Sequence, residues 1–377
     1  MHILVLSAYH AASHDYWLQG LQKALPEHCW DTLTLPPRYF NWRIRGNPLS
    51  WYSEGRPELE TPYDLIIATS TVDVASLRGL IPAWRNTRWV VYFHENQFAY
   101  PPSPEGNVRQ QVEPQMVNLY AALSADALWF NSRFNLDSLI DGCEALCRKL
   151  PDRVPSAGWF HGLREKALVL PVPLQEQNGS PPRAEGLRGS VLRVVWNHRW
   201  EYDKGVDRLL ALVNELNRRV LPVRLTLLGQ RFRSVPQAMT DLLALPAGAV
   251  VVECPDFIEN REQYLALLGE QDVVLSTSLH DFQGLSIMEA VQAGCAPLLP
   301  DRLCYPDFFD AQYRYSSFPN DIEAESKALA DRLQVWIERG LPNVPDLSGL
   351  VWSAQATRYR AAIAHALGNN LPREPVS

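Results

Sequence analysis

The sequence predicts an α/β protein built from two doubly wound domains that face each other across a cleft. Short apolar runs alternate with helical patterns along most of the chain, which is typical of parallel sheets covered by helices. Residues 175–190 interrupt this alternation with Pro, Gly and polar residues that are typical of a linker. A length of 377 residues also favours two domains over one small core. Ligands of such domains usually bind at the carboxyl ends of the strands, so we expect the site in the cleft.

The first domain is expected to comprise residues 1–174. Its strands are predicted at Ile3–Leu6, Asp64–Thr69, Trp89–Phe93 and Ala127–Asn131. Its helices are predicted at Tyr16–Leu25, Val74–Leu80, Val108–Leu123 and Phe134–Leu150. Among these elements lies an aromatic and basic stretch, Leu35–Tyr63, which we expect to be one long loop.

The second domain is expected to comprise residues 191–350 and to repeat the α/β pattern. Its strands are predicted at Leu192–Trp196, Arg224–Leu228, Val250–Glu253, Asp272–Ser276 and Ala296–Leu299. Its helices are predicted at Val206–Val220, Val235–Leu243, Arg261–Leu268 and Leu285–Ala293. We expect residues 351–377 to form a C-terminal helix that crosses back to the first domain.

Composition excludes several classes of protein. A net charge of −7 argues against a generic nucleic-acid coat, although a local basic surface stays open. The six cysteines include no CxxC pair and no metal-binding spacing, which is typical of reduced thiols in the cytosol. Met1 leads directly into a strand, and no apolar run approaches the roughly 20 residues of a membrane span. We therefore expect a cytoplasmic protein with no membrane contact and no obligatory protein partner.

The nucleotide-binding motifs that the sequence lacks limit the class of ligand site that it can contain. Neither GxGxxG nor a Walker A sequence occurs, so the nicotinamide and P-loop classes lose their main support. The stretch Thr277–Ala293 instead joins a polar loop, Gly284 and a predicted helix, with Asp281 and Glu289 on either side of the glycine. A helix N-terminus binds anions, and the two carboxylates can hold hydroxyl groups. This arrangement predicts a sugar-nucleotide site, whereas Glu289 as an exposed helix acid is the alternative.

Two cations follow the first strand of the second domain. Arg199 and Lys204 lie in WNHRWEYDKG, just before Gly205 opens a helix. Cations at the carboxyl end of a strand suit a pyrophosphate and can neutralise the charge that grows on a leaving diphosphate. The alternative is that Arg199 pairs with Glu201, and Lys204 with Asp203, at the surface.

These residues resemble retaining GT-B glycosyltransferases of the family-4 type. The resemblance implies that Arg199 and Lys204 bind the donor diphosphate, together with the backbone amides of Gly284, Leu285 and Ser286. It implies that Asp281 contacts the transferred sugar and that Glu289 contacts the ribose. Asp281 replaces the first glutamate of that family's E-x7-E motif. No D-x-D sequence occurs, so we expect no metal and no other cofactor.

Five segments resemble the tRNA-queuosine mannosyltransferase family more closely. They are SAYHAASHDYW from Ser7, YFHENQ from Tyr92, FNSRFN from Phe130, WNHRWEYDKG from Trp196 and DRLCYP from Asp301. Ala11 and Ala12 replace a Gly-Gly pair of that family, which limits close backbone approach to a ligand. The resemblance implies that His94 contacts the donor hexose, that Asn197 and Gly229 contact the donor, and that His10, His14, Asn96 and Gln97 contact the acceptor.

The alternatives for these residues are structural. A lone histidine at a strand end, such as His94, is often a core residue. Asn96 and Gln97 could equally brace their loop, and His10 and His14 could cap a helix. Glu95 is the only carboxylate beside His94, and we assign it no role.

The stretch PRYFNWRIRGNPLSWYSEGR, from Pro37, interleaves arginines with aromatic residues. Cations bind phosphates and flat rings stack on splayed bases, as single-stranded RNA loops require. We expect Arg38, Trp42, Arg43 and Arg45 to contact the acceptor, although aromatics that pack on the domain are the alternative.

The resemblance implies mannose transfer from GDP-mannose to queuosine in a tRNA anticodon loop. One alternative is a GT-B enzyme with a lipid or saccharide acceptor at the membrane surface, and another is a non-catalytic sugar-nucleotide or RNA-binding protein.

Overall fold

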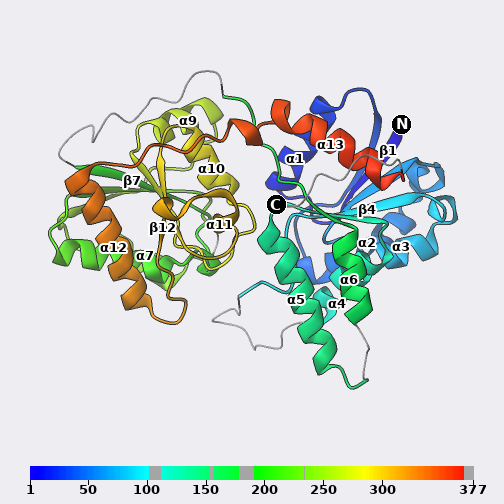
Figure 1. The fold of residues 1–377 in the computed structure, drawn as a ribbon, viewed down its shortest axis with the longest axis horizontal. Coiled ribbons are helices and arrows are strands. Elements are labelled where there is room, and N and C mark those ends of the chain that lie inside the picture. The colour runs from blue at the N-terminus through cyan, green and yellow to red at the C-terminus, as the bar shows by residue number, and fades with distance from the viewer. Residues whose placement is uncertain (102–111, 153–156, 178–190, 233, 369–377) are drawn as a thin grey trace. The chain divides into compact units, whose positions relative to one another are not determined.

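The computed structural model describes residues 1–101, 112–152, 157–177, 191–232 and 234–368 (Figure 1). The described residues form two compact units: the first holds those up to Gln175 and those from Leu350, and the second holds those between Glu176 and Gly349. Most of the predicted linker, from residue 178 to residue 190, lies outside the described residues. So do residues 108–111 of a predicted helix and residues 369–377 of the predicted C-terminal helix.

The first unit is built on a six-stranded parallel sheet with the order β2-β1-β3-β4-β5-β6. The strands are β1 (His2–Ser7), β2 (Cys29–Thr34), β3 (Leu65–Thr69), β4 (Arg88–Phe93), β5 (Ala127–Phe130) and β6 (Ala167–Val169). The helices are α1 (Ala12–Ala24), α2 (Phe40–Ser53), α3 (Val74–Leu80), α4 (Val112–Ser124), α5 (Arg133–Lys149), α6 (Ala157–Glu165) and α13 (Trp352–Ala366). The direction of winding reverses between β1 and β3, which makes that point the expected ligand site of this sheet.

The second unit repeats this architecture with the order β12-β11-β10-β7-β8-β9. Its strands are β7 (Leu192–Asn197), β8 (Val223–Leu228), β9 (Val250–Glu253), β10 (Val273–Leu275), β11 (Ala296–Pro300) and β12 (Arg314–Tyr315). Its helices are α7 (Val206–Arg218), α8 (Gln237–Leu243), α9 (Arg261–Gly269), α10 (Leu285–Gln292), α11 (Tyr305–Phe308) and α12 (Ile322–Arg339). Here the winding reverses between β7 and β10.

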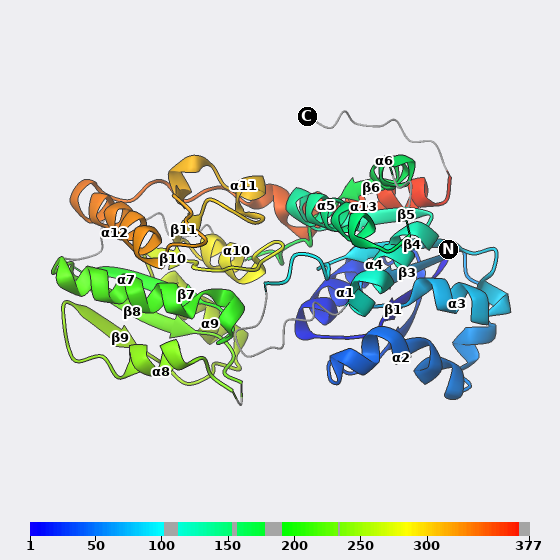
Figure 2. The same ribbon diagram turned by 90° about the horizontal axis from the view of Figure 1, so that it is seen from below.

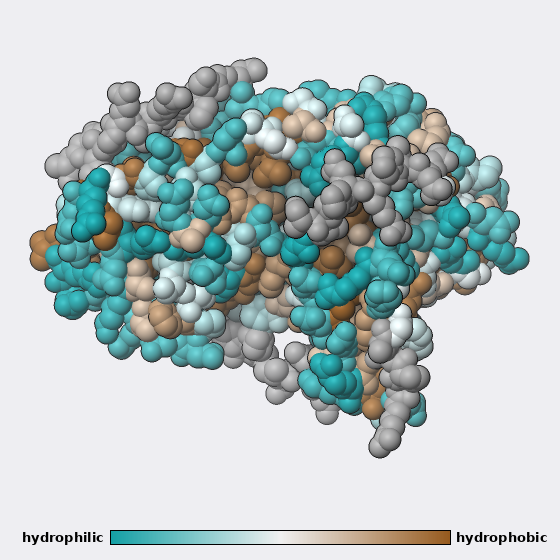
Figure 3. All heavy atoms as spheres, in the orientation of Figure 1, coloured by the Kyte–Doolittle hydropathy of each residue, from teal (hydrophilic) through white to brown (hydrophobic). Residues whose placement is uncertain are grey.

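Each sheet is covered by apolar helix faces. In the second unit, α7 and α12 lie side by side over one face of the sheet, where Leu209 and Leu333 join the strand residue Trp196 in one buried cluster (Figure 2). The buried strand residues of both sheets are dominated by Val, Ile, Leu and aromatics, as expected for parallel sheets covered on both faces. In the face shown in Figure 3, hydrophilic residues cover most of the described surface of each unit.

Helix α13 is held to the first unit by a buried polar network. The Tyr359 hydroxyl lies 3.2 Å from the Trp17 indole nitrogen and 3.2 Å from the Tyr92 hydroxyl, and it donates to the carbonyl of Pro171. Arg360 forms an ion pair with Glu27 on the surface. The last described helix of the chain is therefore part of the first unit.

The prediction of a long loop at Leu35–Tyr63 was wrong, because Phe40–Ser53 forms helix α2. The face that α2 buries includes Gly46, Asn47 and Pro48, which are poor helix formers and weaken the helical pattern in the sequence. Strands β2, β6 and β12 also went unpredicted, since β2 is partly exposed and polar and the other two are very short.

Candidate active site

The candidate donor site lies where β7 and β10 meet in the second unit. These strands pair in parallel, with Trp196 opposite Leu275, so the loops that follow them leave the same edge of the sheet. The loop after β7 carries Arg199 and Lys204, and the loop after β10 carries Asp281. The structure therefore brings these segments, more than 70 residues apart in sequence, to the expected ligand-binding edge.

Backbone contacts lock the two loops together. Gly205 has a φ of 67°, and a β-carbon there would lie 2.1 Å from the carbonyl oxygen of Thr277. The Thr277 hydroxyl donates to the carbonyl of Lys204 at 2.8 Å. The amides of Leu279 and His280 both donate to the carbonyl of Asp203. These contacts fix the backbone that carries Lys204 and Asp281.

Lys204 is buried rather than exposed. Its ammonium donates to the carbonyl of His280 at 2.6 Å and lies 3.3 Å from the Asp203 carboxylate. Burial alone would raise the pKa of Asp203, but His280, Lys204 and Arg199 outweigh it and lower that pKa. Lys204 therefore pairs with Asp203, as the alternative interpretation states, but the pair is buried rather than at the surface.

Asp281 is held by neighbours that favour its charged form. Its carboxylate accepts hydrogen bonds from the Gly284 amide at 3.0 Å and from the Tyr305 hydroxyl at 3.2 Å. Burial acts to raise the pKa of Asp281, but Lys204 and His198 outweigh this effect and lower it. Asp281 is therefore a carboxylate near neutral pH, with fixed orientation.

Gly284 opens helix α10 in the left-handed conformation, with a φ of 77°. The helix geometry leaves the first-turn amides of Leu285 and Ser286 without intrahelical acceptors, so they suit an anion. The Ser286 hydroxyl donates to the backbone carbonyl of Asn197 at 2.9 Å. In return, the side-chain amide of Asn197 donates to the backbone carbonyl of Ser286 at 3.0 Å, and it also donates to the Tyr264 hydroxyl at 2.7 Å. Both side chains therefore fasten α10 to β7.

Glu289 is not the exposed helix acid of the alternative interpretation. Only 14% of its side chain is exposed, and it pairs with Arg261 of α9 at 2.8 Å. The Tyr264 hydroxyl lies 3.4 Å from the other carboxylate oxygen. Tyr264 and Arg261 were not predicted as site residues, because nothing in the sequence links α9 to α10.

Arg199 and Gly229 lie at the neighbouring strand ends. The Arg199 side chain is 52% exposed and pairs with Glu201 at 3.0 Å, as the alternative interpretation states. Gly229 has a φ of 113°, and a β-carbon there would lie 1.9 Å from the carbonyl oxygen of His198. Any other residue at position 229 would displace the loop that carries Arg199.

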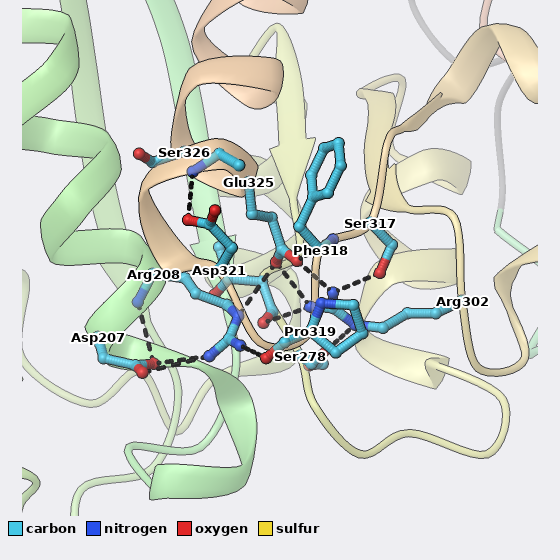
Figure 4. Close-up of polar contacts among 12 residues, drawn as sticks. Asp207, Arg208, Ser278, Arg302, Ser317, Phe318, Pro319, Asp321, Glu325 and Ser326 are labelled. Atoms are coloured by element: carbon cyan, nitrogen blue, oxygen red, sulfur yellow. Dashed lines mark hydrogen bonds and ion pairs between the residues drawn. The ribbon is translucent and has the colours of Figure 1, made fainter.

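A buried network of charges anchors the loop after β10 (Figure 4). Arg302 donates to the carbonyls of Ser278 and Thr277 and forms an ion pair with the fully buried Glu325 of α12. Arg208 of α7 reaches the same carboxylate at 3.2 Å. Glu325 thus joins two arginines to the backbone just before Asp281. These three residues were missed from sequence, although DRLCYP contains Arg302.

In the first unit, three histidines gather at the carboxyl edge of the sheet. The His94 ring lies 4.6 Å from the His14 ring and 4.8 Å from the Trp17 ring. Burial lowers the pKa of both His94 and His14, so both are neutral near neutral pH. His10 lies 3.3 Å from Asp15 near the start of α1, and the His14 ring donates to the carbonyl of Tyr9.

The side chain of Asn96 forms its hydrogen bonds with its own loop and with helix α5. Its amide nitrogen donates to Asn135 and Ser138, and its oxygen accepts from two backbone amides. These contacts favour the loop-bracing alternative for Asn96. The Gln97 backbone is held by Asn118 and Gln115, while the Asn131 amide donates to the carbonyl of His94 at 2.8 Å.

The predicted acceptor residues on and beside helix α2 differ in exposure and in their ion pairs. One stripe of the helix is exposed and carries Trp42 and Arg45 together with Leu49 and Tyr52, whereas Trp51 and Asn47 are buried. Arg45 forms an ion pair with Asp73 at 2.6 Å. Within the described part of the chain, Arg38 and Arg43 form no ion pair.

Two negative findings concern the residues that the structure describes. They contain no group of three or more His, Cys, Asp and Glu side chains placed to hold a metal ion. None of their helices combines the length and the apolar character that crossing a bilayer would require.

Comparisons with known proteins bear on both units. Residues 2–174 match the family model described as tRNA-queuosine alpha-mannosyltransferase N-terminal. A curated tRNA-queuosine alpha-mannosyltransferase from Drosophila melanogaster is 28% identical over 323 residues, 84% of each chain. The resemblance to the tRNA-queuosine mannosyltransferase family is confirmed. The prediction that the chain is a hexosyltransferase is likewise confirmed.

Solved structures with low identity show the same fold. Sucrose-phosphate synthase from Thermosynechococcus elongatus is 14% identical with a TM-score of 0.71, over 98% of this chain and 100% of that one. The catalytic domain of starch synthase IV from Arabidopsis thaliana, bound to ADP and acarbose, is 12% identical with a TM-score of 0.64, over 98% and 99% of the two chains. The predicted GT-B fold, with two Rossmann-like domains, is confirmed.

Glu325→Gln should destabilise the second unit and loosen the donor loop. The change removes the carboxylate charge from two arginines, and breaking a buried ion pair in this way costs about 3–5 kcal/mol. Urea unfolding should show this loss, and the dissociation constant for a nucleoside diphosphate should rise. Glu323→Gln, on an exposed position of the same helix, is the control. Lower stability with unchanged nucleotide affinity would show that the network does not position the site.

Acid should destabilise the protein through its buried histidines. Burial and Lys204 lower the pKa of His198 to about 3, so below about pH 6.5 the unfolded chain binds a proton that the folded chain does not. The unfolding free energy should therefore fall as pH drops from 6.5 towards 5, with a slope that approaches about 1.4 kcal/mol per pH unit near pH 5 for each such histidine. His198→Gln should reduce this slope, measured by urea unfolding. His161→Gln, at an exposed position, should not, and equal slopes for all three proteins would contradict the assignment.

Proposed function

We propose that the chain transfers mannose from GDP-mannose to the queuosine base of a tRNA anticodon loop, with retention of configuration and without a metal ion. The observation that carries this proposal is the similarity to the curated tRNA-queuosine alpha-mannosyltransferase, which extends over 84% of both chains. The donor nucleotide and the hexose follow from the family resemblance. The metal independence rests on the absence of a D-x-D sequence, and the cytoplasmic location rests on the cysteine pattern; both are parts of the same proposal.

The second unit would bind the donor. The diphosphate would lie on the Leu285 and Ser286 amides at the start of α10, with Lys204 and Arg199 beside it. Glu289 would hold the ribose hydroxyls, and Asp281 would accept hydrogen bonds from the hexose. The oriented Asp281 carboxylate and the sheltered Lys204 ammonium support these roles, because preorganised charges stabilise developing charge best away from water.

In the transfer step, the bond between the anomeric carbon and the diphosphate oxygen breaks and a bond to an acceptor hydroxyl oxygen forms. The bonding electrons leave with GDP, and the proton of the acceptor hydroxyl is released. Lys204, Arg199 and the helix amides would stabilise the negative charge on the leaving diphosphate, which is the task a metal ion performs elsewhere. His94 would contact the transferred hexose, and its neutral ring is compatible with a hydroxyl partner.

The first unit would bind the tRNA. Helix α2 supports this role because Trp42 and Tyr52, both more than half exposed, share one stripe with Arg45. Exposed rings beside cations suit the unstacked bases of an RNA loop. The buried Asn47 donates to the carbonyl of Thr71, which fixes α2 to the carboxyl end of β3. Arg38 and Arg43 would supply phosphate contacts.

The direct test is to incubate the protein with GDP-mannose and queuosine-containing tRNA in the presence of EDTA, and to analyse the nucleosides by mass spectrometry. We expect hexosylated queuosine, and no product from the same tRNA with guanosine at that position. Trp42→Ala should raise the KM for tRNA by about 10-fold, since stacking on one base contributes about 1–3 kcal/mol. Tyr120→Ala, at another exposed aromatic position, should leave this KM unchanged. Absence of hexosylated tRNA with every common nucleotide sugar would refute the proposal.

A further inference from the structure

The carboxyl edge of the first sheet carries a group of hydroxyl side chains that have no assigned role. Ser7 is the last residue of β1 and Thr69 is the last residue of β3. The register pairs Leu6 with Ala68, so Ser7 and Thr69 follow side by side. Both lie at the point where the winding of the sheet reverses, which is where α/β sheets bind ligands.

These hydroxyl groups are buried and lack partners. Ser7, Thr69 and Thr71 are at most 1% exposed, and none of their hydroxyl oxygens has a hydrogen-bond partner in the described part of the chain. A buried polar group without a partner costs folding free energy, and most such groups in folded proteins are satisfied. These three hydroxyls, together with the equally buried and unpartnered hydroxyl of Ser70, gather at one edge of the sheet, which suits a ligand that brings hydrogen-bonding groups of its own.

His94 extends the group along the same edge. Thr69 pairs in register with Tyr92, whose ring lies 4.2 Å from the His94 ring. Both ring nitrogens of His94 are buried and have no hydrogen-bond partner among the described residues. Trp17 and His14 pack on the His94 ring and hold it in place. The edge therefore offers these hydroxyls and one imidazole from three adjacent strands.

The chemistry of these groups selects a neutral ligand. A hydroxyl both donates and accepts, and a neutral imidazole has one donor and one acceptor nitrogen. Burial lowers the pKa of His94 well below its usual range, so the ring carries no charge at neutral pH. A phosphate ligand would need cationic side chains, and a cationic ligand would need carboxylates; this group of side chains contains neither. Two neighbouring hydroxyl groups on a ring of the ligand can donate to and accept from these side chains.

We propose that Ser7, Thr69, Thr71 and His94 form a polyol subsite, which binds a neutral vicinal diol. This inference rests on the proposed function, in which two reactants carry such a diol: the ring diol of the queuosine base and the hexose of the donor. The shared chemistry is a pair of neighbouring ring hydroxyls held by hydroxyl side chains and a neutral imidazole.

The test uses variants that remove a hydroxyl while preserving shape, Thr69→Val and Thr71→Val in the full chain. Removing an unsatisfied buried hydroxyl should leave the melting temperature unchanged or raise it, whereas the KM for the diol-bearing reactant should rise at least 10-fold. Thr226→Val is the matched control, since that buried hydroxyl does have a partner, Gln271. It should lower the melting temperature and leave both KM values unchanged.

The kinetic arms distinguish the two sources of the diol. A rise in the KM for queuosine-containing tRNA assigns the subsite to the acceptor, and a rise in the KM for GDP-mannose assigns it to the donor hexose. If Thr69→Val and Thr71→Val both lower the melting temperature and change neither KM, the hydroxyls are structural and the inference is overturned.

A binding measurement separates this inference from the proposed function. Saturation-transfer NMR with free queuosine nucleoside and with mannose should show contact with the wild-type chain that weakens in Thr69→Val. Binding of this kind without any transfer to tRNA would refute the proposed function and leave the subsite standing. Transfer to tRNA with equal KM values in Thr69→Val and wild type would refute the subsite and leave the proposed function standing.

Discussion

The buried positive charge of Lys204 is the feature on which the second unit is organised. Taking an ammonium out of water is unfavourable unless it is paired and hydrogen-bonded. Here the carbonyl of His280 and the carboxylate of Asp203 satisfy it, and the close approach of Gly205 to Thr277 holds the two loops together. The Lys204–Asp203 pair is largely removed from water, and well-packed apolar residues often stabilise such positions as well as an ion pair does, so stability alone does not account for the pair.

The support for this charge extends well beyond the loops that carry it. Glu325 binds Arg302 and Arg208 in the interior, and Arg302 holds the backbone just before Asp281. Helices α7 and α12 therefore hold the carboxyl edge of this sheet through charges as well as through apolar packing. The first unit holds its edge differently, with asparagine amides such as Asn131, which donates to the carbonyl of His94. Buried ion pairs thus anchor the edge of the second unit, whereas neutral amide groups hold the backbone of His94 in the first.

Sequence patterns predicted the parts of this structure that depend on local periodicity. The long buried strands and the glycine that opens α10 follow from apolar runs and from backbone geometry that favours glycine. Helix α2 could not be recognised, because the poor helix formers Gly46, Asn47 and Pro48 interrupt the apolar residues of its buried face. The partners of Glu289, Arg261 and Tyr264, come from a helix with no sequence link to it. The anchoring role of Arg302 depends on a tertiary contact with Glu325, and no local pattern encodes that contact.

The most direct test of this account is calorimetric titration of GDP into the full chain in the presence of EDTA. A charge-assisted contact with the diphosphate contributes about 1.5–3 kcal/mol, so Lys204→Ala should weaken binding by about 10- to 100-fold. Lys166→Ala is the matched control, because the Lys166 ammonium also donates to a backbone carbonyl, that of Ala125, in the first unit. We predict that Lys166→Ala binds GDP as the wild type does. Equal GDP affinity in Lys204→Ala and wild type would contradict the account.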